Sequence, residues 1–212
     1  MSPAPGQAAD GPGPVAVGDL SRLPTFAFGS RSPIWWGTSC FMLIEGTAFL
    51  LAGGAYLYLR GRADGWPPAG TRPPDLIWGT LFTVVLLVSL IPNIWLTKRA
   101  KNLDLPAVRL GMILVVLFAL AGLLLRAFEF PHLNCRWDVN AYGSITWALM
   151  TLHTTHLITD AADTVALGAF TFTHDVDGER FVDVTDNCNY WNFVVLSWLP
   201  IYALVYWAPR LL

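Results

Sequence analysis

Long apolar segments separated by short polar ones dominate the hydrophobicity pattern of this chain. Each apolar segment is close to the ~20 residues that a helix needs to cross a bilayer. The segments are Ile34 to Leu59, Leu76 to Leu96, Leu110 to Phe128, Ile145 to Phe172 and Tyr190 to Trp207. The pattern therefore predicts an all-α, polytopic membrane helix bundle with five transmembrane helices.

The composition agrees with a membrane protein, because 54% of the 212 residues are hydrophobic and only 13% are charged. So few polar groups are too few to cover a water-soluble globule of this size. Residues 1–33 are rich in Gly, Pro and Ala and lack the apolar region of a signal peptide. We expect a flexible N-terminal tail at 1–33 and one five-helix domain at 34–212.

The segment between the second and third apolar stretches gives the best indication of orientation. It contains Lys98, Arg99, Lys101 and Arg109, and short basic loops are retained in the cytoplasm. This rule predicts a cytoplasmic N-terminus and a periplasmic C-terminus. We also expect Trp191, at the start of the fifth span, to lie in the headgroup layer, and residues 173–189 before it to form a solvated acidic turn.

The fourth apolar stretch carries a stripe of polar side chains. At about 100° per residue, His153, His156, Asp160, Asp163 and Thr164 fall on one third of the helix circumference. Ionisable groups at membrane depth are costly and usually functional. The stripe is compatible with interhelical hydrogen bonds, with contacts to lipid or protons, and with metal binding, although di-iron bundles draw ligands from several helices.

Three further ionisable groups lie in or at the ends of spans. Glu45 is halfway along the first span, which suits a group that exchanges a proton or contacts a lipid headgroup. A neutral Glu45 that hydrogen-bonds to a histidine of the fourth span is the structural alternative. Arg126 and Glu129 end the third span at a spacing that allows an interfacial ion pair.

Several short motifs occur in an order that resembles one known family. They are IEGTAF at 44–49, GWPPAG at 65–70, RAFEF at 126–130, YGS at 142–144, LHTTH at 152–156 and NYWNFVVLSW at 189–198. Together they resemble subunit III of the haem-copper oxidases, the cytochrome c oxidase family, in its short five-helix form. Asn192 and Val195 stand where that family usually has His and Asp, and Thr154 stands where it usually has Gly.

The resemblance implies an accessory subunit of a proton-pumping terminal oxidase in an aerobic respiratory chain. It implies packing on the catalytic subunit I, with subunit II and a larger supercomplex as further partners, in the bacterial inner membrane. It also implies a cleft that holds phospholipid and supports proton uptake and stability during turnover. Our hypothesis is that Glu45, His153 and His156 line or brace this cleft.

Four histidines are too few to ligate the haems and copper of an oxygen-reducing centre. We therefore expect no catalytic residue, metal or redox cofactor in this chain, and haems and copper in partner subunits. Glu129, Arg126, Asp160 and Asp163 remain candidates for polar contacts with partners. No feature indicates nucleic-acid binding.

Two other classes of function remain as alternatives. A small stand-alone transporter or channel would use the His and Asp stripe as a proton or cation path, although the two halves of the chain show no repeat. A metal-dependent membrane oxidase or hydroxylase would use the same stripe as ligands, but it would need more histidines than this chain has.

Overall fold

The computed structural model describes residues 26–211, and every long element in this part of the chain is a helix. The long helices are α1 (Pro33–Arg62), α2 (Leu76–Lys101), α3 (Leu105–Glu129), α4 (Ala141–Thr173) and α5 (Gly178–Tyr202). The short ones are η1 (Gly29–Arg31), η2 (Phe130–His132), the π-helical turn η3 (Ala203–Trp207) and α6 (Ala208–Leu211). The predicted all-α architecture is confirmed. Most of the predicted tail, 1–33, lies outside the described residues.

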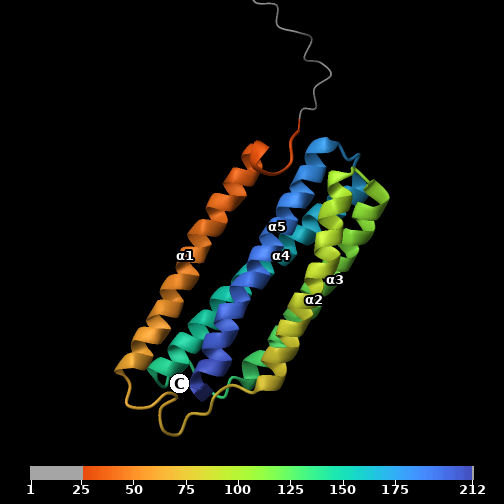
Figure 1. The fold of residues 1–212 in the computed structure, drawn as a ribbon. Coiled ribbons are helices and arrows are strands. Elements are labelled where there is room, and N and C mark those ends of the chain that lie inside the picture. The colour runs from red at the N-terminus through yellow and green to blue at the C-terminus, as the bar shows by residue number, and fades with distance from the viewer. Residues whose placement is uncertain (1–25, 212) are drawn as a thin grey trace, which may run out of the picture.

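The helices form one elongated bundle in which α1 stands to one side (Figure 1). Helix α2 packs along α3 and α5, whereas α1 packs against α4 and α5 on the side away from the α2 and α3 pair. Only Phe49 and Tyr56 of α1 are buried. Helices α4 and α5 therefore form the centre of the bundle.

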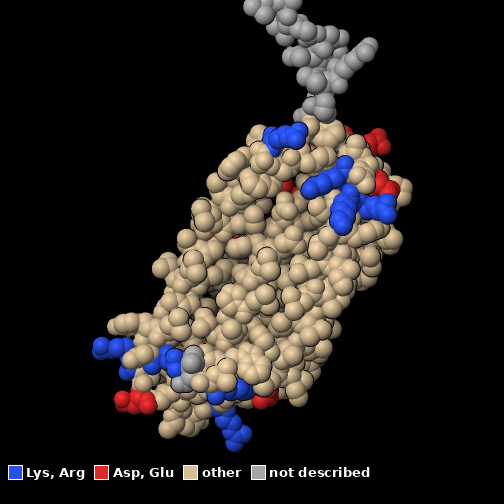
Figure 2. Space-filling view, viewed as in Figure 1, with Lys and Arg blue, Asp and Glu red and all other residues tan. Residues whose placement is uncertain are grey.

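Within residues 26–211, four helical segments have both the length and the apolar composition to cross a membrane: Pro33–Arg62, Leu76–Lys101, Leu105–His132 and Gly178–Leu211. Helix α4 has the length, at 33 residues, and runs through the bundle beside them. Charged side chains gather at the two ends of the molecule, with an uncharged belt between them on the visible face (Figure 2). This distribution suits a helix bundle whose apolar sides face lipid.

The largest difference from the sequence prediction is at the start of the last long helix. Helix α5 begins at Gly178, not Tyr190, and the Asp177 side chain caps it by accepting a hydrogen bond from the Arg180 N–H at 3.3 Å. The predicted solvated turn at 173–189 is therefore wrong for most of its length. Trp191, predicted in the headgroup layer, is fully buried and donates to Ser89 Oγ at 2.8 Å.

Pro92 does not interrupt α2, which continues to Lys101. Its neighbour Asn93 is fully buried, and its side-chain amide donates to the Cys188 carbonyl at 2.9 Å and to Asn192 Oδ1 at 2.8 Å. Both partners belong to α5. The amide therefore holds α2 and α5 together in the middle of the bundle.

Near the other end of α5, the π-helical turn η3 brings Tyr206 into the core against α2. Tyr206 is fully buried, and its ring lies where a side chain on Gly79 would otherwise be. An added Cβ at Gly79 would overlap the carbon atoms of this ring. Gly79 is therefore the position that lets the Tyr206 ring approach α2.

We expect Gly79→Ala to lower the stability of the folded chain by about 1–3 kcal/mol, because overpacking forces the Tyr206 ring out of its position. The matched control is Gly54→Ala in α1, since no atom lies within 4 Å of the added carbon there. Thermal unfolding in mild detergent measures both. Equal unfolding temperatures for the two variants would contradict the close contact.

Candidate functional site

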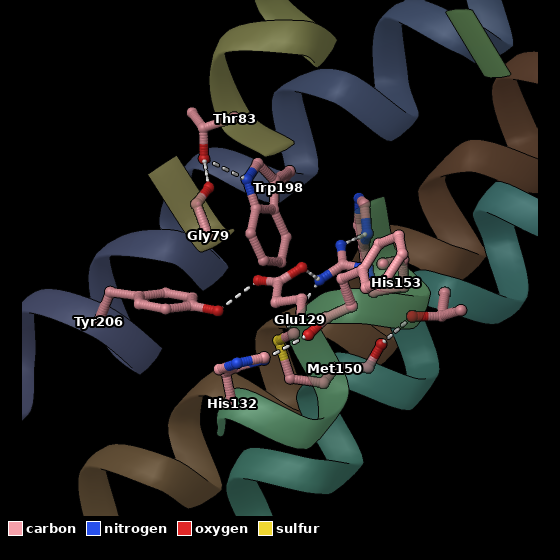
Figure 3. A network of polar contacts seen from close by, with 11 residues as sticks. Gly79, Thr83, Glu129, His132, Met150, His153, Trp198 and Tyr206 are labelled. Atoms are coloured by element: carbon pink, nitrogen blue, oxygen red, sulfur yellow. Dashed lines mark hydrogen bonds and ion pairs between the residues drawn. The ribbon is translucent and has the colours of Figure 1, made fainter. Parts of the chain in front are cut away.

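The residues singled out from the sequence lie in two polar clusters that meet at α4. The first, called here the Arg126 cluster, consists of Arg126 and Glu129 of α3, Met150 and His153 of α4, and Tyr206 of the π-helical turn (Figure 3). The second lines a cleft between α1 and the α4 and α5 pair. The single stripe predicted on α4 is thus divided between two environments.

Arg126 is the centre of the first cluster and is only 1% exposed. Its Nη1 donates to Glu129 Oε2 at 2.7 Å and lies 3.6 Å from Met150 Sδ, and its Nη2 donates to His153 Nδ1 at 3.0 Å. Glu129 Oε1 accepts a hydrogen bond from the Tyr206 hydroxyl. The positive charge is therefore balanced by a carboxylate that is itself fully hydrogen-bonded.

Two aromatic rings contact the guanidinium of Arg126. Its central carbon lies 3.8 Å from the centroid of the Phe82 ring and 4.3 Å from that of Trp198. The Trp198 indole N–H donates to Thr83 Oγ1 at 2.8 Å, which fixes the ring in place (Figure 3). Cation–π contacts of this kind are strongest where water is excluded.

The hydrogen bonds determine the protonation of His153. The Val194 carbonyl only accepts, so the contact of 3.0 Å to it requires a proton on Nε2. The guanidinium only donates, so Nδ1 carries no proton. His153 is therefore a neutral imidazole, with both ring nitrogens used inside the bundle.

The ion pair predicted between Arg126 and Glu129 is confirmed, but it lies inside the bundle and not at the membrane interface, since both side chains are 1% exposed. His153 is fully buried in the same cluster. It does not line the cleft, where the sequence analysis had grouped it with Glu45 and His156. This cluster joins α2, α3, α4 and α5 to the π-helical turn.

The cleft between α1 and the α4 and α5 pair has a volume of about 780 Å³. Its lining includes Glu45 of α1, His156, Asp160 and Asp163 of α4, and Asn187 and Tyr190 of α5. Apolar side chains of α1 and α4, among them Phe41 and Phe170, form much of the remaining wall. The cleft therefore offers both an apolar surface and a group of acids.

Glu45 connects three helices across this cleft. Its Oε2 accepts from the Tyr190 hydroxyl at 2.7 Å, and its Oε1 lies 3.2 Å from His156 Nε2. His156 Nδ1 lies 2.7 Å from the Leu152 carbonyl, which requires a proton on Nδ1. The contact between Glu45 and a span-4 histidine, the structural alternative in the sequence analysis, is present.

Asp160 and Asp163 differ in their surroundings. Asp163 is exposed, and its Oδ2 accepts from Asn187 Nδ2 at 3.1 Å. Asp160 is 1% exposed, and among the described residues neither of its carboxyl oxygens has a hydrogen-bond partner.

Asn187 and Tyr190 were not singled out from the sequence. The Asp177 cap and the helical spacing of Phe181, Val184 and Cys188 would have extended the last helix far enough to include both.

No group of three or more His, Cys, Asp or Glu side chains within residues 26–211 is arranged to hold a metal ion. The same residues contain three ion pairs in the loops and helix ends that are much more exposed than the pair of Arg126 and Glu129. In one of these, hydrogen bonds from Arg136 to Asp138 at 2.8 and 3.0 Å lower the pKa of the Asp138 carboxyl. This exposed pair provides a comparison for the buried one.

We expect Arg126→Gln to destabilise the folded chain by roughly 3–5 kcal/mol, because it leaves the Glu129 carboxylate buried without its cation. Arg136→Gln, at the exposed pair, should leave the unfolding transition unchanged, since water replaces the lost contact. Chemical unfolding in detergent compares the two. A small effect at Arg126 would mean that its charge is not what stabilises this core.

Comparisons with known proteins agree with this architecture. A sequence model described as "Cytochrome c oxidase subunit III" matches residues 46–209, which is most of the chain. A protein named cytochrome c oxidase subunit 3 from Schizophyllum commune is 26% identical over 145 residues, covering 66% of this chain and 53% of that protein. The chain thus spans about half the length of this relative. The match over residues 46–209 includes α2 to α5 and the Arg126 cluster, whereas Glu45 and the rest of the α1 wall of the cleft lie just before it. The match shows that this chain belongs to the cytochrome c oxidase subunit III family.

Proposed function

We propose that this chain is the accessory subunit III of a haem-copper terminal oxidase, without a redox centre of its own. In this proposal it packs on the catalytic subunit I, beside subunit II, and the haems and copper lie in those partners. The contacts made by the two histidines inside the bundle support the absence of a redox centre. His153 and His156 each have both ring nitrogens engaged by other groups of this chain, so neither is free to bind a haem iron or copper.

The proposed role in the complex is to bind lipid in the cleft and to support proton uptake during oxygen reduction. The observation that carries it is the bridge from Glu45 to His156 and Tyr190 at the inner end of the cleft. The bridge brings a carboxyl and an imidazole together, and both are groups that exchange protons readily. An apolar wall beside an acid at membrane depth suits a phospholipid.

We further propose a cytoplasmic N-terminus and a periplasmic C-terminus in a bacterial inner membrane. The basic end of α2, with Lys98, Arg99 and Lys101, supports this orientation. The first half of α1 and the start of α5, which form the cleft, lie at the same end of the bundle (Figure 1). The cleft would then open toward the cytoplasmic side, from which an oxidase takes its protons.

Affinity purification of the chain from its native membrane in mild detergent tests the assembly. We expect haem bands in a reduced-minus-oxidised spectrum, together with a large membrane subunit identified by mass spectrometry. A colourless chain that purifies alone would contradict the proposal and favour a stand-alone transporter.

Substitution of Glu45 tests the role of the bridge. We expect Glu45→Gln to leave assembly and initial oxygen consumption intact, but to shorten the active lifetime of the oxidase several-fold, because the bridge loses its proton-exchanging carboxyl. Glu179→Gln is the matched control, since Glu179 is exposed and lies outside the lining of the cleft. An unchanged lifetime for Glu45→Gln would sink the proposed role of this site.

A further inference from the structure

The two halves of α1 are held to the bundle in different ways. Both buried side chains of this helix, Phe49 and Tyr56, belong to its second half. The first half forms one wall of the cleft, where Phe41 stacks on the Tyr190 ring with 6.0 Å between the ring centroids. Close packing of α1 on the bundle therefore ends near the middle of the helix.

The segment before α1 makes a turn that is tied to the first residues of the helix. Gly29 has a φ of +66°, a left-handed conformation that glycine adopts without strain. The Ser32 backbone N–H donates to the Gly29 carbonyl at 2.8 Å, and the Trp36 indole N–H donates to the Ser30 carbonyl at 3.0 Å. From this turn, the chain runs between the start of α1 and the start of α5 (Figure 1).

Two phenylalanines attach the same segment to the bundle. The Phe26 ring lies against Gly178, the first residue of α5, and an added Cβ at Gly178 would overlap atoms of this ring. Phe28 packs on the core cluster that includes Ala100 of α2 and Phe181 of α5. The two rings also contact each other edge to face at 5.7 Å. The segment is therefore joined to α1 at one end and to α5 at the other.

We propose that residues 26–32 form a strap that sets the width of the cleft. The lining residues nearest to the strap are Ile34 on α1 and Arg180 on α5, and none of residues 26–32 lines the cleft. The strap thus joins the two walls at this end without filling the space between them. When the strap is released, the first half of α1 swings outward about the contacts of Phe49, and this end of the cleft opens.

The packing of the strap suits a segment that opens and closes. Both phenylalanine rings of the strap are only partly buried, in contrast to the fully buried core between α2 and α5. Segments with few buried apolar contacts open at a small cost in free energy while the rest of the fold stays intact. The strap therefore controls access to the cleft, whatever the cleft holds.

The test measures how fast a water-soluble maleimide modifies the Thr38→Cys variant of the full chain, purified with its native partners in mild detergent. Thr38 lines the cleft on the α1 wall, one turn from Ile34, so the rate of modification reports how open this end is. Peptide mass spectrometry distinguishes the new thiol from the native ones. Cys135, a partly buried free thiol in the loop between η2 and α4, is the internal reference.

Gly178→Ala, made in the Thr38→Cys chain, releases the strap because the added Cβ takes the place of the Phe26 ring. Alanine is also a better helix former than glycine, so α5 itself is not weakened. We expect modification at position 38 to become about fivefold faster relative to Cys135, which is the population shift that the loss of one aromatic contact gives. Gly61→Ala in α1, where no atom lies within 4 Å of the added carbon, is the matched control and should leave the rate unchanged.

Phe26→Ala removes the same contact from the other side and should accelerate modification to the same extent. The double variant of Phe26→Ala and Gly178→Ala should then be no faster than either single variant, because both changes remove one interaction. If Gly178→Ala fails to fold, Phe26→Ala decides alone, since it shortens a side chain that is only partly buried.

Unchanged modification in both single variants would overturn the strap, and so would additive effects in the double variant, which would indicate two unrelated disturbances. The strap goes beyond the proposed function and does not depend on it, because the rate of modification needs neither a haem subunit nor oxygen consumption. A chain that shows the expected rates but purifies without haem would overturn the proposed function alone.

Discussion

The buried charge of Arg126 is the constraint on which the rest of this bundle depends. A guanidinium cannot lose its proton at ordinary pH, so the chain must supply partners for it wherever it lies. Four elements do so: α3 gives Glu129, α4 gives His153, and α2 and α5 give the rings of Phe82 and Trp198. Each partner in turn needs hydrogen bonds or packing of its own, so the buried charge constrains how the helices pack.

That support explains features which are otherwise unrelated. Glu129 needs a second donor, which Tyr206 provides only because the π-helical turn carries its ring toward α2 and because Gly79 leaves room for it. Trp198 is held by Thr83 on the next turn of α2. A glycine, a π-helical turn and a threonine thus all serve one ion pair. Helix α1 contributes none of these groups, which agrees with its position at the side of the bundle.

The sequence predicts the helices well because apolar length is a strong signal in a membrane protein. It also predicts the ion pair of Arg126 and Glu129 from their spacing, and a contact between Glu45 and a histidine of α4. It fails at the start of α5, where polar residues such as Asp186 and Asn187 are buried against α4 and were interpreted as solvated. The sequence also cannot predict which cluster each histidine of α4 belongs to. His153 and His156 are one turn apart, and their partners are determined by the neighbouring helices.

The polar side chains of α4 are accommodated at membrane depth in two different ways. On the side of His153, every charge has its partner within the chain, and the packing is closed around it. On the side of His156, the chain leaves a cleft, the contact between Glu45 and His156, and the carboxyl of Asp160, which has no hydrogen-bond partner among the described residues. The open side is where this helix retains the capacity to bind, and a rigid, neutral core behind it keeps the acids of the cleft in place.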